Sequence, residues 1–268
     1  MSDRRAAFHA LHHAARPLLL PNAWDHASAA ALAARGHPAI GTTSLGVAAA
    51  AGRPDGEAAT AWETLALAGR LARLPVLLTV DVEAGFSDDP ATVAGYVAEL
   101  AGLGAVGINL EDGRADGTLA DIDATADKIA AVKAAVPDLF VNARTDTWWL
   151  GLADPLPQTL NRARAYRAAG ADGIFVPGIA ELATLRLLSE RIDAPLNALH
   201  QPGGPGLAEL GRAGVARVST GSLLFRAALA AALDTAAAIR ADTVTTPPTP
   251  PTLPSYAEVQ GLVAAADN

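Results

Sequence analysis

The sequence has no cysteine, two lysines and no cluster of basic residues. The absence of cysteine excludes disulfides, thiolate nucleophiles and cysteine-ligated metals. The formal net charge is −8, and no basic patch interrupts it, so neither nucleic acid nor an anionic membrane surface is expected as a partner. No uncharged apolar run reaches the roughly 18 residues of a membrane span. The first residues have no apolar segment behind their arginines, so no secretory signal and a cytoplasmic location are expected.

What the chain does contain is enough apolar material for one large core. Its 268 residues are 51% hydrophobic, a length typical of a single α/β barrel and too short for two. Eight short apolar runs recur, each followed by an alanine-rich helical pattern. The runs are residues 16–21, 39–44, 75–83, 105–112, 139–146, 173–178, 195–200 and 217–222. Each is apolar nearly throughout, which is typical of parallel strands buried on both faces.

This repeat predicts an α/β fold, a (β/α)8 TIM barrel over residues 1–242. Asp25, Asp89 and Asp121 are expected to cap helices at their N-termini. Gly36, Gly104 and Gly170 stand where helices should end. The alternative is a doubly wound open sheet, but no G-x-G-x-x-G follows the first predicted strand.

After the barrel the sequence changes character. Residues 243–254 are rich in proline and threonine, which predicts an extended, semi-rigid linker. Residues 255–268 then predict a short C-terminal helix. From the sequence this helix is equally able to return to its own barrel or to dock on a neighbouring subunit.

Acidic residues gather at the carboxyl ends of adjacent predicted strands, where α/β barrels carry their chemistry. Asp81 and Glu83 end the third strand, Glu111 ends the fourth, and Arg144 ends the fifth. Alternation along a strand places Asp81 and Glu83 on the same side. Carboxylates without histidine or cysteine suit a hard cation, Mg²⁺ or Mn²⁺. The alternative interpretation is a ring of ion pairs with Arg144 and helix caps.

Several residues are candidates for binding a substrate carboxylate. Arg144 can hold it with both arms of its guanidinium, or it can simply neutralise the surrounding acids. The turn after the second strand, Thr43, Ser44, Leu45 and Gly46, offers backbone amides, and an ordinary loop is the competing reading. Asn197, in the predicted strand 195–200, is a further candidate substrate contact.

The lysine count narrows the chemistry. Lys128 and Lys133 both lie in one helical stretch, so no lysine stands at a strand end to form a Schiff base. Stabilisation of an enolate by a metal ion remains possible.

The strand-end motifs resemble the isocitrate lyase/phosphoenolpyruvate mutase superfamily, in family order over about residues 18–235. The matching stretches include T-T-S-L-G, L-L-T-V-D-V-E-A-G-F, G-I-N-L-E-D-G, V-N-A-R-T-D and A-G-A-D-G-I-F-V-P-G. The resemblance implies that Asp81 binds Mg²⁺ most directly, with Glu83 and Glu111 acting through water. It also implies a catalytic acid at Asp55, a carboxylate-binding turn at residues 43–45 and a substrate-binding role for Arg144.

The resemblance further implies a homo-oligomer, a dimer or tetramer, whose subunits exchange the last helix. Two features depart from the family. The mobile loop with K-K-C-G-H that lyase members carry after L-E-D is missing, since Gly113 runs directly toward the next helix. Pro177 also stands where other members have His or Glu. The predicted metal-binding acids are thus retained, while the mobile loop and the cysteine that serves as proton donor are absent.

We therefore expect a Mg²⁺-dependent lyase that cleaves a C–C or C–P bond of a small 2-oxo or 2-hydroxy carboxylate, similar to oxaloacetate decarboxylase. A site without a lid excludes water poorly, which suits decarboxylation better than a protected rearrangement. One alternative is a phosphoenolpyruvate mutase, a phosphonopyruvate hydrolase or a ketopantoate-type hydroxymethyltransferase. Another is a barrel that binds carboxylates without catalysis.

Overall fold

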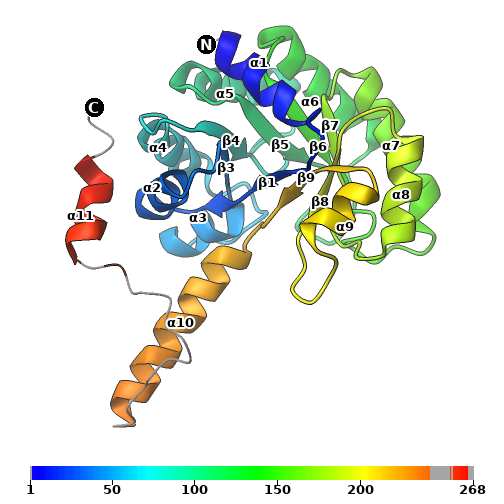
Figure 1. Ribbon diagram of the computed structural model, residues 1–268. Helices are drawn as coiled ribbons and strands as arrows, with labels where there is room; N and C mark the ends of the chain where they lie inside the picture. Colours follow the sequence, from blue (N-terminus) through cyan, green and yellow to red (C-terminus); the bar gives the residue numbers. More distant parts are fainter. Residues whose placement is uncertain (1, 242–253, 255, 265–268) are drawn as a thin grey trace.

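The computed structural model describes residues 2–241, 254 and 256–264, and over these residues the chain forms a parallel α/β barrel (Figure 1). The strands are β1 Leu18–Leu20, β2 Asn22–Ala23, β3 Ala39–Thr42, β4 Leu77–Asp81, β5 Gly107–Glu111, β6 Phe140–Arg144, β7 Gly173–Phe175, β8 Leu196–Leu199 and β9 Val215–Ser219. All pairings between them are parallel, in the order β1-β9-β8-β7-β6-β5-β4-β3-β2.

The first barrel strand is divided at Pro21. Its first half, β1, pairs with β9, and its second half, β2, pairs with β3. Because β1 and β2 are separated only by Pro21, the two ends of the nine-stranded sheet meet and the barrel is nearly closed. The eight strands predicted from the sequence and the (β/α)8 fold class are thus confirmed.

Helices surround the barrel, and one of them, α1, closes the end at which the strands begin. They are α1 Ser2–Leu11, α2 His26–Ala34, α3 Ser44–Ala51, α4 Ala61–Leu71, α5 Pro90–Leu103, α6 Ile122–Ala135, α7 Pro155–Ala168, α8 Leu182–Arg191, α9 Leu207–Arg212, α10 Leu223–Arg240 and α11 Tyr256–Ala264. Phe8 of α1 is fully buried and packs on Leu18, Leu20 and Phe140. The amino-terminal end of the barrel is therefore plugged, and only the opposite end is open for chemistry.

The predicted helix boundaries follow from local hydrogen bonding. Asp25 accepts a hydrogen bond from the Ser28 amide, Asp89 from the Thr92 amide and Asp121 from the Asp123 amide, so each satisfies an amide that has no partner inside its helix. The three predicted terminating glycines adopt positive φ angles, which end the helices and turn the chain toward the next strand.

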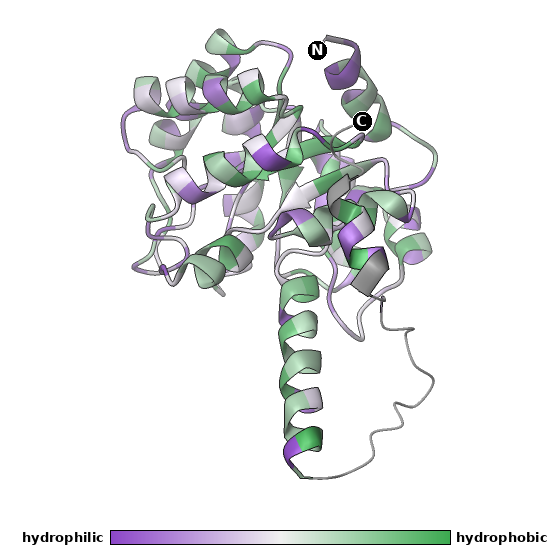
Figure 2. Ribbon diagram, turned by 90° about the vertical axis from the view of Figure 1, so that its left-hand side faces the viewer, coloured by the Kyte–Doolittle hydropathy of each residue, from purple (hydrophilic) through white to green (hydrophobic). Residues whose placement is uncertain are grey.

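Helix α10 projects from the body of the barrel (Figures 1 and 2). None of its 18 residues is buried, and Leu229, Leu233 and Ile239 are exposed. The terminal helix α11 lies beside α2, where His26 Nε2 is 3.4 Å from the Leu262 carbonyl oxygen. The predicted linker 243–254 lies outside the described residues apart from residue 254. Among the described helices, none is long and apolar enough to cross a membrane.

Candidate active site

A cavity of about 370 Å³ opens at the carboxyl ends of the strands. It is lined by residues from all sides of the barrel mouth. Those predicted from the sequence are Thr43, Ser44, Leu45, Asp55, Asp81, Glu111 and Arg144. Residues that the sequence did not single out include Arg114, Phe175 and Leu199. Seven candidates spread over about 100 residues of sequence therefore meet in one pocket, whereas Gly46, Glu83 and Asn197 do not line it.

On the β5–β6 side of the mouth, three charged residues form a chain of ion pairs. Arg144 Nη1 is 2.6 Å from Glu111 Oε2, and Arg144 Nε is 2.6 Å from Asp146 Oδ1. A second bond joins Arg144 Nη2 to Asp146 Oδ2 at 3.0 Å. Burial lowers the pKa of Arg144, but Glu111 and Asp146 outweigh it, so the net shift is upward. The guanidinium stays charged and is held on two of its sides.

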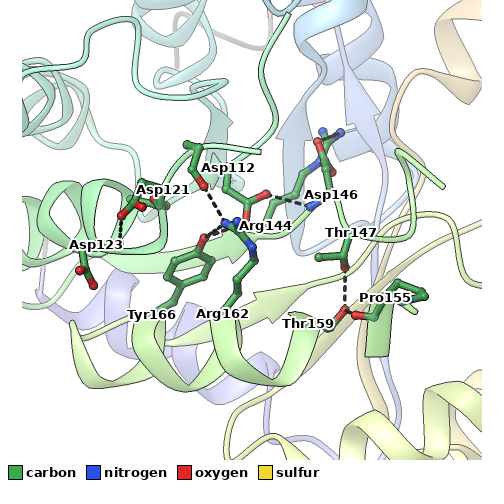
Figure 3. A network of polar contacts seen from close by, with 12 residues as sticks. Asp112, Asp121, Asp123, Arg144, Asp146, Thr147, Pro155, Thr159, Arg162 and Tyr166 are labelled. Carbon is green, nitrogen blue, oxygen red and sulfur yellow. Dashed lines mark hydrogen bonds and ion pairs between the residues drawn. The ribbon is translucent and has the colours of Figure 1, made fainter. Parts of the chain in front are cut away.

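Behind these ion pairs lies a buried network that fixes Asp146 (Figure 3). Asp112 accepts a hydrogen bond from the Asp146 amide at 2.9 Å. Its other oxygen accepts one from Arg162 Nη1 at 3.0 Å and one from the Tyr166 hydroxyl at 2.7 Å. Both partners belong to α7, so this helix sets the position of the β6 strand end, and through Asp146 it positions Arg144.

The β3–β4 side is acidic and has no such cation. Asp81 accepts a hydrogen bond from the Glu83 amide at 3.2 Å. Burial raises the pKa of the Asp81 carboxyl group, Arg144 opposes this, and Asp55 adds to the rise by repulsion. Burial likewise raises the pKa of Glu111 to about 8, with Arg144 opposing and Asp81 contributing. Asp81, Asp55 and Glu111 thus bring three acidic side chains to a cavity that Arg114 and Arg144 also line, and burial disfavours the charged forms of Asp81 and Glu111.

Glu83 has a different place from the one its spacing suggested. Strand β4 ends at Asp81, and Glu83 adopts a left-handed backbone conformation with φ of 50°, so strand alternation no longer applies. Its carboxylate accepts hydrogen bonds from the Ala58 amide at 3.0 Å and the Thr60 hydroxyl at 2.8 Å. Glu83 thereby fastens the loop that carries Asp55, and it borders a neighbouring hollow rather than the main cavity.

The predicted carboxylate-binding turn forms the start of α3. Thr43 is the N-cap residue, and its side chain makes no capping hydrogen bond. The first amides of α3 therefore lie beside the cavity with the positive end of the helix dipole, an arrangement suited to an anion. Gly46 faces the protein instead, since a Cβ there would lie 2.7 Å from Trp24 Cβ. It lets the turn approach Trp24 closely.

Asn197 lies in the interior of the barrel rather than at the mouth. It is 1% exposed, and its Oδ1 accepts a hydrogen bond from the Ser219 hydroxyl at 3.0 Å. A contact between Asn197 and a substrate in the cavity would have to pass through the residues that line the mouth.

The donor set at the mouth fits a hard divalent cation. Asp81 and Glu111 offer carboxylate oxygens, and burial with mutual repulsion raises the pKa of both, a strain that a bound cation relieves. In the described part of the chain, no three histidine or acidic side chains are close enough to hold a metal ion by themselves. Two carboxylates are nevertheless a donor set that Mg²⁺ commonly takes, completing its shell with water and substrate.

Two parts of the site were missed by the sequence argument. Arg162 and Tyr166 act from α7, and helical spacing alone does not reveal that they reach the barrel. Arg217 is buried inside the barrel. The signal for Arg217 was available, because it is the one charged residue in the apolar run of β9.

Comparison with known proteins identifies the family. Residues 8–240 match the family described as phosphoenolpyruvate phosphomutase. The chain therefore belongs to this family of enzymes, within the isocitrate lyase/phosphoenolpyruvate mutase superfamily. An uncharacterized protein of Mycobacterium tuberculosis is 47% identical over 87% of this chain and 88% of its own length. An oxaloacetate decarboxylase of Ectopseudomonas mendocina is 35% identical over 64% of this chain and 61% of its own length.

Solved structures agree with this assignment. A Burkholderia cenocepacia protein, provisionally assigned as a phosphonomutase, superposes with a TM-score of 0.82 at 40% identity, covering 89% of this chain and 99% of its own. A phosphonopyruvate hydrolase, solved with oxalate and Mg²⁺, has a TM-score of 0.82 at 23% identity, covering 97% of this chain and 95% of its own. At that identity the second likeness shows a shared fold. The protein is thus an enzyme of a superfamily of lyases and mutases.

Proposed function

We propose that this protein is a Mg²⁺-dependent lyase that cleaves the bond between C3 and the distal carboxylate of a small 2-oxo acid, in the manner of an oxaloacetate decarboxylase. The observation that carries the proposal is the pair Asp81 and Glu111, which face one cavity and whose carboxyl groups both have a raised pKa because burial disfavours their charged forms. The oxaloacetate decarboxylase relative supports the choice of substrate class. Mn²⁺ is expected to replace Mg²⁺.

In this proposal the two sides of the mouth hold the cation together. Asp81 and Glu111 would bind it. Glu83 would act from outside the cavity, through the hydrogen bond that its backbone amide donates to Asp81. The turn at Thr43, Ser44 and Leu45 would bind the carboxylate next to the carbonyl, through the Leu45 amide, and Arg144 would present its remaining donor positions to the substrate. The phosphonopyruvate hydrolase of the same fold contains both Mg²⁺ and a small dicarboxylate, oxalate, which supports this pairing.

The bond changes are those of a decarboxylation. The bond between the leaving carboxylate and C3 breaks, its electron pair moves into the C2–C3 bond, and CO₂ departs. A bound divalent cation would stabilise the negative charge that develops on the carbonyl oxygen. C3 then takes up a proton to give the shorter oxo acid. Asp55, exposed on the loop after α3 and lining the cavity, is the candidate to deliver that proton.

The absence of a long loop after β5 supports decarboxylation over rearrangement. Gly113 and Leu119 are joined by an isolated bridge, so the segment between β5 and α6 is a tight turn. A rearrangement needs its intermediate shielded from water and from protons. In a decarboxylation, by contrast, protonation of the enolate intermediate is the step that completes the reaction.

The test is turnover of oxaloacetate with Mg²⁺, measured as pyruvate formed above the uncatalysed rate. We expect activity to be abolished by EDTA and by Asp81→Asn with the fold unchanged, and retained in the matched control Asp127→Asn, an exposed acid on α6. Turnover that survives EDTA would contradict the metal mechanism. Tight binding of oxalate with Mg²⁺ but no turnover of any oxo acid would instead favour a non-catalytic carboxylate-binding barrel.

Cleavage of a C–P bond is the second candidate, favoured by the phosphonomutase assignment of the 40% identical structure. Phosphonopyruvate offered in the same assay, with phosphate release or phosphoenolpyruvate as the readout, separates it from the first. A third arm with 2-oxoisovalerate and a one-carbon donor tests the hydroxymethyltransferase alternative.

We also infer that the protein forms a homo-oligomer, a dimer or tetramer, through α10. A projecting helix with exposed Leu229, Leu233 and Ile239 buries its apolar surface only against another chain. Exchange of the terminal helix between subunits remains a prediction. Light scattering of the wild type and of Leu233→Asp tests the assembly, and a monomeric wild type would contradict it.

A further inference from the structure

A polar layer lies inside the barrel, directly below the acidic mouth. Arg217 of β9 is the largest of its fully buried side chains, with 0% exposure. Its neighbours in this layer are the buried amides Asn109, Asn142 and Asn197. Asn109 is the register partner of Asp81, so the layer adjoins the strand end that carries the acid.

Arg217 has few hydrogen-bond partners for a buried guanidinium. Its Nη2 donates to Asn109 Oδ1 at 3.0 Å, and the same oxygen accepts from Asn142 Nδ2 at 2.9 Å. Its Nε and Nη1 have no hydrogen-bond partner in the described residues, and no carboxylate lies within ion-pair distance of it there. A buried charge without a paired anion is strongly unfavourable, so a compensating role is expected.

The charged groups around Arg217 show what compensates that cost. Burial lowers the pKa of Arg217 to about 9, and attraction to Asp81 opposes this shift. On the opposite side, burial and the charge of Arg217 lower the pKa of His12 to about 3, so His12 is neutral. Arg217 therefore remains a cation at neutral pH, and the charge that it faces is the acidic mouth.

We propose that Arg217 is a positioning residue that supplies a fixed positive charge beneath Asp81, weakening the hold of the mouth on a divalent cation and strengthening its hold on an anionic oxo acid. This role rests on the proposed function, because it concerns the same cation and substrate. At low dielectric, a charge within roughly 10 Å of a site changes a binding constant by more than about fivefold. It needs no contact with either ligand.

The physical advantage is a balance between the two ligands. Four acids, Asp55, Asp81, Glu111 and Asp146, line the cavity together with two arginines, Arg114 and Arg144. Without Arg217, the acids would bind a cation tightly and repel a substrate carboxylate. With Arg217 below, the same acids bind the cation less tightly and leave a net potential that admits the anion.

Opposite changes in two affinities test this role. Mn²⁺ affinity is measured by calorimetry without substrate, and oxalate affinity at saturating Mn²⁺. In Arg217→Met we expect Mn²⁺ to bind on the order of tenfold more tightly and oxalate on the order of tenfold more weakly. Arg217→Lys, which keeps the charge, should stay within about threefold of wild type on both. General loosening of the barrel would weaken both affinities together.

Two controls complete the experiment. Arg167→Met removes the same charge from the outer helix layer, where Arg167 bonds the Asp193 carbonyl oxygen, and should leave both affinities within about twofold. If Arg217→Met does not fold, Arg217→Gln, which retains a donor for Asn109, should show the same opposite changes. A folded neutral variant with unchanged or weaker Mn²⁺ binding overturns the role of Arg217 alone. A wild-type chain that takes up no Mn²⁺ overturns the metal function and this role together.

Discussion

The two sides of the barrel mouth are built differently. On the β5–β6 side, Arg144 pairs with Glu111 and Asp146, and Asp112 holds the Asp146 amide from behind. On the β3–β4 side, Asp81 accepts hydrogen bonds from backbone amides and is repelled by Asp55, and the positive charge of Arg144 acts on it without a direct ion pair in the described residues. The first side is satisfied internally. The second side carries unbalanced charge.

This difference separates the part of the site that holds its shape from the part that awaits a ligand. Buried charges with full complements of partners fix geometry, and their removal costs stability. Buried charges without partners lower stability and are retained where they bind something. Substitution of Asp112, which braces the paired side, and of Asp81, which faces the cavity, should therefore change stability in opposite directions.

The largest effect is expected from Asp112→Ala on the paired side. The substitution leaves Arg162 buried without its anion and frees the Asp146 amide, which should lower the free energy of unfolding by about 3 kcal/mol or more. Urea unfolding measures it. Asp123→Ala, an exposed acid in the first turn of α6, is the control and should change stability by less than about 1 kcal/mol. Equal effects of the two substitutions would contradict a bracing role for Asp112.

The pH dependence of stability should come from the acids of the mouth. The pKa of Glu111 is raised from 4.5 to about 8, so between these values the folded chain holds a proton that the unfolded chain has released. The free energy of unfolding of the metal-free protein should therefore decrease as the pH rises from about 4.5 to about 8. Asp81 and Asp146, whose pKa values are also raised, act in the same direction.

Thermal unfolding at pH 5.5, 7 and 8.5 measures this slope. Glu111→Gln should reduce the loss of stability across that range, while Glu190→Gln, an exposed control on α8, should leave it unchanged. Saturating Mg²⁺ should also reduce it, because the cation replaces the proton. A wild-type protein whose stability rises over this range would show that Arg144 keeps Glu111 ionised.

A smaller effect is expected for Tyr166→Phe. The hydroxyl donates to Asp112 at 2.7 Å and accepts from Arg162 at 3.0 Å, so its removal should cost about 1–2 kcal/mol. Because the ring still fills its place in the core, Mg²⁺ affinity should change by less than about twofold. A large loss of metal affinity with little loss of stability would place Tyr166 among the ligand-binding groups instead.

The smallest effect, and one of opposite sign, is expected for the stability of metal-free Asp81→Asn. Removing a carboxylate whose charged form is disfavoured on balance should raise the free energy of unfolding by up to about 1 kcal/mol at pH 7.5, while Mg²⁺ no longer stabilises the chain. Calorimetric scans with and without Mg²⁺ measure both. A clear loss of stability in the metal-free variant would mean that Asp81 is already satisfied within the protein.

The sequence predicted the positions of some residues on these two sides and not of others. Asp81, Glu111 and Arg144 end adjacent apolar runs, and parallel strands that end at one edge bring such residues together, so their convergence on one cavity followed from the pattern. The position of Glu83 could not be predicted in this way, because β4 ends two residues before it and a left-handed turn redirects its side chain to Thr60. Arg162 and Tyr166 lie on α7, and no local pattern shows that an outer helix reaches under a strand end.

The sequence by itself determined the eight-unit barrel, the edge at which the chemistry is gathered and the acidic character of that edge, since these depend on periodicity and on residue type. Only the tertiary structure decided which acids are paired and which are not. Charge pairing depends on distances of a few ångströms between side chains far apart in the chain, as between Asp112 and Tyr166 or between Arg217 and Asn109, and burial makes those distances decisive by removing the water that would otherwise screen them.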